Sequence, residues 1–543
     1  IFFQHPKEVF VCSLIVNLPC VFWVGLLIRG GGNNSPRPAS QRAAALVLTA
    51  AMLTTFTAPA FAGTWYIEDG DITISAGESG NNVTQNENTT KNDTDTIITN
   101  REEGASSHTV TIDAKDKDDK VEVTLKDANI DTSKQSKAAV SVTGSGDTTI
   151  ELDGDNELQG GDRHAGLEHN QTVDSEGNVT SGKLTIQDDN DNAGSLTATG
   201  GYFGAGIGGG SAKAGQVTIT GGTITAISGD GAGIGGGQGN MGSNAGNADI
   251  EISGGTIEAT GGYTSAGIGG GYYGDATIKI TGDAVIKNAT GGTFGAGIGG
   301  GGGGNGDVTI SGNAKIENAQ GGYAGSGIGG GYGASGTVTI KDDSTVTATG
   351  GEAGAGIGGG VGGLADVTIE GNATVNAIGG VGSAGIGGGY DAENDEDDGN
   401  GNQISIKSNE SGAPTVNATG GESSIDKKTG EKIPGGAGIG SGAGDAKANI
   451  TLEGKVTIVA KAGEGNAAIG DMNGEQVFTG LDGSITRYDS EGNDTTLPTD
   501  PGYPVPADTS SSGGGSAGAS VQESVFPGLV VTDKDGQRIS YTS

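Results

Sequence analysis

Gly204-Ala-Gly-Ile-Gly-Gly-Gly210 decides the fold of this chain, because near copies of the phrase recur as far as residue 440. The copies align on their central isoleucines, which are Ile207, Ile234, Ile268, Ile298, Ile328, Ile357, Ile386 and Ile439. Six of the seven gaps are 27 to 34 residues long, and the last is 53. A fixed period of this size is typical of stacked supersecondary units, each of which needs its neighbours to bury its apolar face.

Each repeat contains three short strand-like segments, and residues 217–219, 223–226 and 232–234 are one example. The first segment alternates apolar and polar residues, which places one side in a core and the other in water. Gly-Gly pairs between the segments supply the positive φ that sharp corners need, and no window has a sustained helical period. The sequence predicts an all-β fold, a parallel β-helix of three-strand coils, with the right-handed sense usual for parallel crossovers.

An export signal precedes the repeats. Basic residues Arg37 and Arg42, an apolar core and the motif Ala60-Phe61-Ala62 predict a signal peptide over residues 37–62. Cleavage is expected after Ala62, so that the mature chain begins at Gly63. We therefore expect an extracellular or cell-surface protein.

The remaining segments are arranged around the repeats. The expected parts are an uncertain upstream segment over 1–36, a β cap with an Asn/Thr-rich stretch over 63–108, the β-helix over 109–475, a C-terminal cap with a Pro/Ser/Gly linker over 476–520, and the start of a further module over 521–543. For the upstream segment, a reading-frame artefact is preferred to a membrane anchor. The insertion at 423–434 lies beside a corner and is expected to bulge from the stack.

Charge and cysteine content limit the partners. Without residues 1–62 the chain has 25 basic and 65 acidic residues, a net charge of −40. This charge disfavours nucleic acid and anionic membranes, which attract basic patches, and no stable membrane insertion of the mature chain is expected. Cys12 and Cys20 both precede the cleavage site, so stacking rather than disulfides must stabilise the mature chain.

Glycines of the repeated phrase also satisfy the G-x-G-x-x-G pattern of dinucleotide sites. That mechanism requires a helix directly after the glycines and one such loop per βαβ unit. Here no helix is predicted and the motif recurs throughout the array. We therefore expect no nucleotide, and interpret the glycines as corner residues.

Tyrosines recur at equivalent positions beside the phrase. Five residues before an isoleucine stand Tyr202, Tyr263 and Tyr323, and four residues after one stand Tyr272, Tyr332 and Tyr390. In a stack of coils such positions become rows along one edge. Exposed rings could stack on sugars, which makes these six the candidate carbohydrate-binding residues; alternatively, the rings stack on one another and close a corner.

Two acidic stretches, 188–192 and 391–402, have the oxygen density that hard cations prefer. The candidate calcium ligands are Asp188, Asp191, Asp391, Asp395, Asp397 and Asp398. Calcium is a possible cofactor, although none is required. A solvated loop is the simpler interpretation, because Ser405 stands where an EF-hand would have its closing Glu.

One cluster contains residue types suited to catalysis, namely Asp162, Arg163, His164, Glu168 and His169. Histidines and carboxylates together could serve acid/base or metal chemistry. The cluster lies in a degenerate copy of the corner, and no second cluster completes a site. We therefore expect no enzyme activity, with a polysaccharide lyase or hydrolase as an alternative.

The pattern Val-Thr-Ile-x-Gly-Gly-Thr-Ile-x-Ala-x-Gly-Gly, followed by the repeated phrase, resembles secreted glycine-rich β-helix repeat proteins on the surface of Gram-positive bacteria. It is similar to β-helical carbohydrate-binding domains, of the kind that bind acidic plant polysaccharides with calcium, and to adhesins. The resemblance covers residues 109–470. It implies an extracellular, non-enzymatic binding protein, adhesin-like, for a polysaccharide or host glycan. A passive stalk or surface filament is the other alternative.

Overall fold

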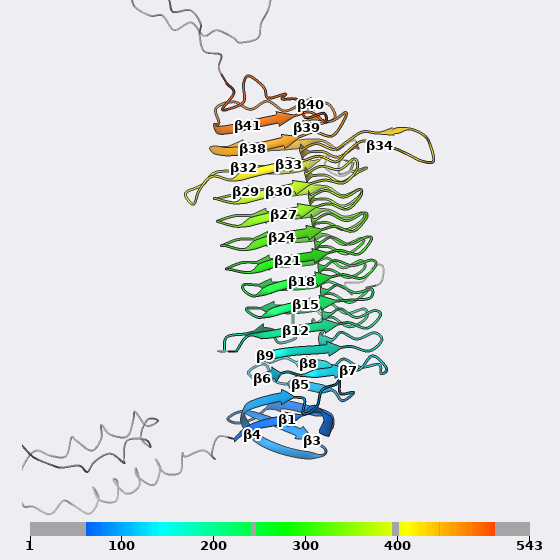
Figure 1. The fold of residues 1–543 in the computed structure, drawn as a ribbon, viewed down its shortest axis with the longest axis vertical. Coiled ribbons are helices and arrows are strands. Elements are labelled where there is room, and N and C mark those ends of the chain that lie inside the picture. Colours follow the sequence, from blue (N-terminus) through cyan, green and yellow to red (C-terminus); the bar gives the residue numbers. More distant parts are fainter. Residues whose placement is uncertain (1–60, 191, 240–245, 394–400, 445, 505–543) are drawn as a thin grey trace, which may run out of the picture. The chain divides into compact units, whose positions relative to one another are not determined.

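The structure is a computed structural model that describes residues 61–190, 192–239, 246–393, 401–444 and 446–504. These residues form a stack of parallel β-coils of about 14 turns (Figure 1). The helical content of the described residues is one 3-10 turn, η1 (Ile67–Asp69), and none of it is long or apolar enough to cross a membrane. The expected all-β, parallel β-helix architecture is confirmed.

Three rows of strands run along the stack. The first row consists of β1 (Phe61–Tyr66), β4 (Asn88–Thr99), β6 (Lys120–Lys126), β9 (Asp147–Gln159), β11 (Leu184–Gln187), β14 (Gly215–Ile219), β17 (Ala248–Ile252), β20 (Ala276–Ile280), β23 (Gly306–Ile310), β26 (Gly336–Ile340), β29 (Ala365–Glu370), β32 (Asn402–Lys407) and β37 (Ala448–Glu453). Neighbouring strands pair in parallel, as in the register of Val217 with Ile250. Their inward residues are apolar and their outward ones are polar, as the alternation predicts.

The second row turns a corner from the first. It consists of β7 (Asn129–Asp131), the last residues of β9, β12 (Gly194–Thr199), β15 (Thr223–Ile227), β18 (Thr256–Thr260), β21 (Val285–Thr290), β24 (Lys315–Gln320), β27 (Thr345–Thr349), β30 (Thr374–Ile378), β33 (Thr415–Thr419), β38 (Lys455–Lys461) and β41 (Asp482–Tyr488). Ile224 and Ala226 are its buried positions in one coil.

The third row contains the repeated phrase. It consists of β2 (Ile72–Ala76), β5 (Val110–Ala114), β8 (Val140–Gly144), β10 (Leu167–His169), β13 (Ile207–Gly208), β16 (Ile234–Gly235), β19 (Ile268–Gly269), β22 (Ile298–Gly299), β25 (Ile328–Gly329), β28 (Ile357–Gly358), β31 (Ile386–Gly387), β36 (Ile439–Gly440) and β39 (Ile469–Asp471). From β13 to β36 these strands are only Ile-Gly pairs, and they start later than the Ala-Gly-Ile segments expected, because the glycines around each isoleucine form the corners.

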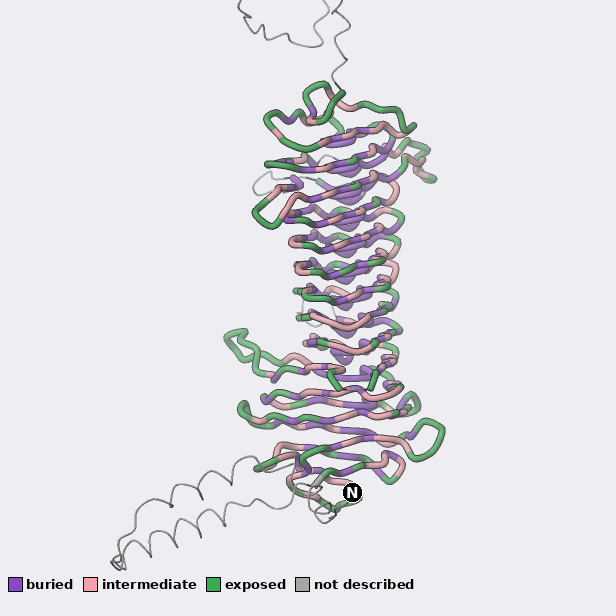
Figure 2. The backbone as a smooth tube through the Cα atoms, turned by 60° about the vertical axis from the view of Figure 1, so that its left-hand side comes forward, coloured by how far each residue is buried: buried purple, intermediate pink, exposed green. Residues whose placement is uncertain are grey.

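The central isoleucines form a continuous ladder inside the stack. Ile207 pairs in register with Ile234, and the same register continues through every coil to Ile469. Towards the N-terminus, Leu167 and Val140 continue it. All are fully buried, and Figure 2 shows buried residues running along each coil with the exposed segments in the loops. Full burial of one such side chain stabilises the folded state by about 1.5–3 kcal/mol relative to leaving it exposed.

The glycine that follows each isoleucine permits this close stacking. Gly299 has φ 139°, a conformation that side chains rarely adopt. A Cβ atom on Gly299 would lie 2.0 Å from the carbonyl oxygen of Gly329 in the next coil. The coils can therefore approach one another here because Gly299 has no side chain to meet that carbonyl oxygen.

Parallel pairing extends beyond the expected limits of 109–475 at both ends. At the N-terminal end, β1 pairs with β4 and β2 pairs with β5, all in parallel. Antiparallel β3 (Asn81–Gln85) connects β2 and β4 within this first turn. At the C-terminal end, β41 pairs in parallel with β38. The coil pattern thus continues where the glycine phrase is absent from the sequence.

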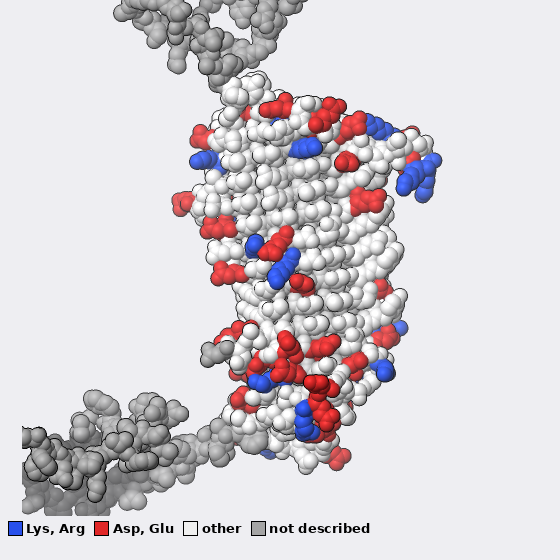
Figure 3. Space-filling view, viewed as in Figure 1, with Lys and Arg blue, Asp and Glu red and all other residues white. Residues whose placement is uncertain are grey.

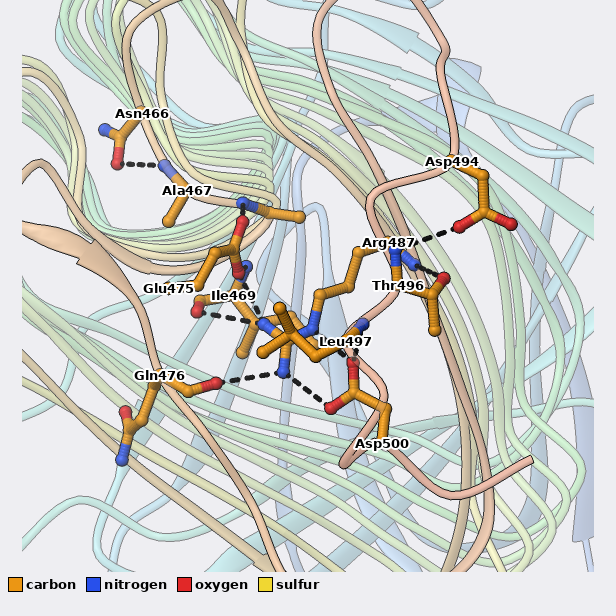
Figure 4. A network of polar contacts seen from close by, with 11 residues as sticks. Asn466, Ala467, Ile469, Glu475, Gln476, Arg487, Asp494, Thr496, Leu497 and Asp500 are labelled. Atoms are coloured by element: carbon orange, nitrogen blue, oxygen red, sulfur yellow. Dashed lines mark hydrogen bonds and ion pairs between the residues drawn. The ribbon is translucent and has the colours of Figure 1, made fainter. Parts of the chain in front are cut away.

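The last coil is closed by a buried polar network (Figure 4). Arg487 of β41 is fully buried and donates hydrogen bonds to Asp500, to Glu475 of β40 (Gly474–Glu475) and to two backbone carbonyls. Asp500 in turn accepts a hydrogen bond from the N–H of Leu497. The segment after β41 is thereby held across the end of the core.

A hairpin projects from the stack between β33 and β36 (Figure 1). It consists of β34 (Ser424–Ile425) and β35 (Lys432–Ile433), which pair antiparallel. The bulge expected at 423–434 is therefore confirmed. The predicted upstream segment, nearly all of the signal peptide, the end of the linker and the further module lie outside the described residues.

Candidate functional site

Two rows of corner residues meet along one edge of the stack. A residue four positions after an isoleucine donates its N–H to the carbonyl of the residue four positions before the isoleucine of the preceding coil. The pairs are Ser211 with Arg163, Gln238 with Phe203, Gly302 with Thr264, Tyr332 with Phe294, Val361 with Ala324, and Tyr390 with Ala353, at 2.7 to 3.3 Å. We call this line of residues the corner edge. Because the backbone fixes its rows side by side, the tyrosines from different coils become neighbours.

The corner edge is hollowed into a groove of about 400 Å³ below the hairpin. Three of the six predicted tyrosines, Tyr323, Tyr332 and Tyr390, line this groove. The other lining residues include Phe294, Val361, Val381, Ile425, Lys427, Lys428 and Ile433. We call this cavity the aromatic groove. Its walls are apolar and its rim carries charge, as is typical of ligand sites.

Two tyrosine rings of the groove are half exposed, and one of them, Tyr332, packs on Phe294. Tyr323 and Tyr332 are 55% and 49% exposed. Phe294 stands edge-to-face with Tyr332 and with Tyr263, with ring centroids 5.5 Å apart in both pairs. Such pairs stabilise by about 0.5–1.5 kcal/mol beyond burial. The contact with Phe294 therefore orients the Tyr332 ring, and about half of Tyr332 remains exposed.

The other candidate tyrosines lie outside the groove. Tyr202 packs on Phe203, with centroids 4.5 Å apart. Tyr272 packs on Tyr273 at 4.1 Å, and a hydrogen bond of 3.1 Å joins the two hydroxyls. That hydrogen bond raises the pKa of the Tyr272 hydroxyl. For these two residues, packing on a neighbouring ring is the observed arrangement.

The hairpin is fixed to the body of the stack by Glu464. Lys432 forms an ion pair with the Glu464 carboxylate, and Ser423 donates a hydrogen bond of 2.7 Å to the same group. These contacts hold the pKa of Glu464 below its usual value. At the tip, the Asp426 carboxylate accepts the N–H groups of Lys428 and Thr429 at 2.6 and 3.0 Å. The sequence predicted the bulge, but not that it forms a wall of the tyrosine groove.

Charge is unevenly placed around this site. Figure 3 shows acidic side chains towards the edges and the two ends of the visible face, whereas basic side chains gather on the projecting hairpin at the upper right. Its basic residues are Lys427, Lys428 and Lys432. Burial, followed by the negative charges of Asp391 and Asp426, raises the pKa of Tyr390 in the groove. That hydroxyl therefore remains a hydrogen-bond donor at neutral pH.

A second, more polar cavity of about 600 Å³ lies further along the corner edge. We call it the polar pocket. Its lining residues include Arg163, His164, Glu168, Asn170, Phe203, Lys213 and Gln238. His164 Nδ1 lies 2.8 Å from Glu168 Oε2, and Asn170 donates to Glu168 Oε1 at 2.9 Å. The Glu168 hydrogen bond raises the pKa of His164 above 6.5.

The structure thus brings together part of the predicted catalytic cluster. Arg163, His164 and Glu168 share the polar pocket, while Asp162 pairs with Arg163 over 3.6 Å at the surface. His169 is excluded, because it is buried with its ring nitrogens 3.3 and 2.9 Å from the carbonyl oxygens of Val142 and Gly182. Burial lowers the pKa of His169.

The predicted calcium ligands are only partly described. The Asp188 carboxylate accepts a hydrogen bond from the N–H of Gly194 at 3.1 Å, so one of its oxygens is used within the local turn. Asp391 lies at a corner with φ 59°. Within the described ranges, no group of three or more His, Cys, Asp or Glu side chains is arranged to hold a metal. The remaining candidates, Asp191, Asp395, Asp397 and Asp398, lie outside the described residues.

The repeats match a known family. Residues 192–211, 217–238, 250–272, 338–361 and 367–390 each match the beta helix repeat family. Every matched segment ends four residues after the central isoleucine of its coil, at the corner edge. Together with the stacked coils, these matches support a chain built from β-helix repeats. No curated protein and no solved structure matches it.

Proposed function

We propose that this chain is an extracellular, non-enzymatic binding protein, adhesin-like, whose aromatic groove holds a polysaccharide or a cell-surface glycan. The observation that carries the proposal is the convergence of Tyr323, Tyr332 and Tyr390 beneath the hairpin. Tyr323 and Tyr332 flank Ile328 in one coil, Tyr390 follows Ile386 in a later coil, and the first two rings are half exposed. The signal peptide expected over 37–62 is the basis for placing the protein outside the cell.

The groove suits a sugar chain for two reasons. The C–H faces of sugar rings pack well on aromatic rings that are already held by their neighbours, since little side-chain freedom is lost on binding. Around the rings, Lys427, Lys428, Asp426 and the Tyr390 hydroxyl supply donors and acceptors for sugar hydroxyls. Because the groove lies along the stack, successive sugar units would contact successive coils.

A glycan array probed with the mature chain, residues 63–543, tests this proposal with and without calcium. We expect binding to a restricted set of glycans. Replacing Tyr323 and Tyr332 by Ala should then weaken binding about tenfold or more, since each ring contact contributes on the order of 1 kcal/mol.

Tyr272→Ala is the matched control, because Tyr272 is at an equivalent position but lies outside the aromatic groove. If no glycan binds, the passive stalk or filament is the better description. If the control weakens binding as much as the groove variants do, the ligand site is elsewhere.

A second candidate function, polysaccharide cleavage, is favoured by the polar pocket. A carboxylate-oriented histidine beside Arg163 and Lys213 is a constellation that could exchange protons with a bound sugar. Release of reducing ends or unsaturated products from pectin and related polysaccharides would support it. That activity should be lost in Glu168→Gln and retained in Tyr323→Ala.

A further inference from the structure

Asp93 of β4 is a carboxylate buried beneath the first strand of the stack. Only 1% of the residue is exposed. Its Oδ1 accepts the backbone N–H of Gly63 at 2.8 Å and that of Asp95 at 3.4 Å. Its Oδ2 accepts the indole N–H of Trp65 at 2.8 Å. Every one of these donors is a neutral group.

A buried carboxylate with neutral partners alone is unusual, because removing the charge from water is costly unless an opposite charge compensates it. Among the described residues, no lysine, arginine or histidine forms an ion pair with Asp93. Arg487 shows the contrast, since its buried partner Asp500 is directly paired with a cation. At the N-terminal end of the stack, the part of the chain that the structure describes therefore supplies no cationic partner for this buried carboxyl group.

The nitrogen nearest to Asp93 belongs to the residue at which the mature chain is expected to begin. Gly63 is buried, whereas Ala62 before it is exposed. Cleavage of the Ala62–Gly63 amide by water would leave the carboxylate on Ala62 and a free amine on Gly63, which takes up a proton near neutral pH. The same nitrogen atom would then carry a positive charge.

We propose that Asp93 is the receptor for the N-terminal ammonium of Gly63, created when the signal peptide is removed. Export processing thereby completes a buried ion pair that locks β1 onto β4. In the pairing of β1 with β4, the irregularity lies between Phe61 and Ala62, and regular register continues from Ala62 through Gly63 to Tyr66. Removal of residues up to Ala62 leaves four register pairs intact, from Gly63 to Tyr66.

The inference goes beyond glycan binding and depends on the processing site. The N-terminal ammonium then has a structural role, because it neutralises the Asp93 carboxylate in the first turn of the solenoid. That turn needs the added stability, since a terminal coil has a neighbouring coil on one side only. A chain that retains its leader would keep the neutral amide and a looser first turn. The groove and the polar pocket are formed by later coils, so failure of this inference would leave the proposed function intact.

The test compares two full-length mature chains produced by a protease that leaves a free amine, one starting at Gly63 and one starting at Ala62. Hydrogen exchange of the amides in β1 and β4 is the readout. We expect exchange at least tenfold slower in the Gly63 chain, because only its ammonium reaches Asp93. Asp93→Asn should remove this difference between the two chains.

A second measurement does not depend on the stability of the Asp93 variant. Acetylation of the α-amine by a succinimidyl ester at pH 7 should be at least tenfold slower in the Gly63 chain than in the Ala62 chain. Equal exchange and equal acetylation rates would overturn the inference. So would a secreted protein whose N-terminal sequence begins at a residue other than Gly63.

Discussion

Arg487 and Asp500 form an ion pair in which both side chains are completely buried, with Arg487 Nε 2.7 Å from Asp500 Oδ2. Asp500 lies in a segment without regular strand structure that follows the last parallel strand. Glu475, from the other side of the core, also pairs with the same guanidinium. One arginine therefore connects three chain segments at the end of the described stack, beyond the last parallel strand of the described residues (Figure 4).

Replacing Arg487 by Met should open the last coil. The change leaves Asp500 and Glu475 without their cation in a buried site, and breaking a buried pair in this way costs about 3–5 kcal/mol. We expect hydrogen exchange to accelerate most strongly in β41 and β38, and less in coils further from the end. Exchange resolved by peptide mass spectrometry measures this gradient.

Arg101→Ala is the control for that prediction. Arg101 pairs with Asp69 over 2.9 Å, but the two side chains are 50% and 46% exposed. Exposed pairs contribute about 0–1 kcal/mol. If the two substitutions had equal effects on their own ends of the stack, burial would not explain the importance of Arg487.

Gly299→Ala should destabilise the middle of the stack more than Gly333→Ala does. Both glycines have positive φ, 139° and 70°. A Cβ at Gly299 would collide with the Gly329 carbonyl oxygen at 2.0 Å, whereas a Cβ at Gly333 would meet no atom within 4 Å. We expect a cost on the order of 3 kcal/mol for the first and about 1 kcal/mol for the second in urea unfolding. Equal costs would mean that backbone conformation alone, rather than contact between coils, explains the recurring glycine at this position of the phrase.

The stacking could be predicted from sequence because it depends on one period. Residues that occupy the same place in each repeat, such as Ile207 and Ile234, must lie above one another once the repeats stack. The rows of tyrosines followed from the same reasoning. Neither prediction required knowledge of how the chain turns at each corner.

The contacts that depend on the path of the chain could not be predicted. The hairpin beside the tyrosines is held by Glu464, which stands two coils after Tyr390 in the sequence. Glu168 and His169 are adjacent in β10, so their side chains point to opposite faces and cannot share one site. Asp93 and Arg487 stand in segments without the repeated phrase, where no periodic signal marks a buried position.

His164 and His169 should titrate on opposite sides of 6.5. The Glu168 hydrogen bond raises the pKa of His164, and burial lowers the pKa of His169. Two-dimensional NMR of the imidazole rings measures both midpoints. Glu168→Gln should lower the His164 midpoint and leave that of His169 unchanged.

The contributions of the two histidines to the free energy of unfolding depend on pH in opposite directions. A raised pKa means that the stabilisation from protonated His164 is complete below about pH 6.5 and is lost as the pH rises through its folded value. A lowered pKa means that the stabilisation from neutral His169 is complete above about pH 6.5 and is lost as the pH falls through its folded value. His169→Gln should therefore reduce the loss of stability on acidification, measured by urea unfolding from pH 7 to pH 5.

Calcium should raise the melting temperature of the mature chain more than sodium chloride of matched ionic strength, if the acidic segments form specific sites. A net charge of −40 produces self-repulsion that any cation screens, so only the excess over sodium reports binding. A ligand at one hundred times its Kd adds about 2.7 kcal/mol to the folded state. Replacing Asp395, Asp397 and Asp398 by Asn should remove most of that excess.

The matched control for charge removes three carboxylates elsewhere, by Glu102→Gln, Glu103→Gln and Asp118→Asn. All three side chains are exposed and far in sequence from 391–402. This variant has the same net charge as the Asp395, Asp397 and Asp398 variant, and therefore relieves the same amount of repulsion. Because it keeps the candidate ligands, it should retain the excess rise in melting temperature in calcium. Two outcomes would mean that the acidic segments are solvated loops and that the stack needs no metal. In the first, both triple variants lose the excess rise in melting temperature equally. In the second, calcium and sodium chloride raise the melting temperature of the unmodified chain by the same amount.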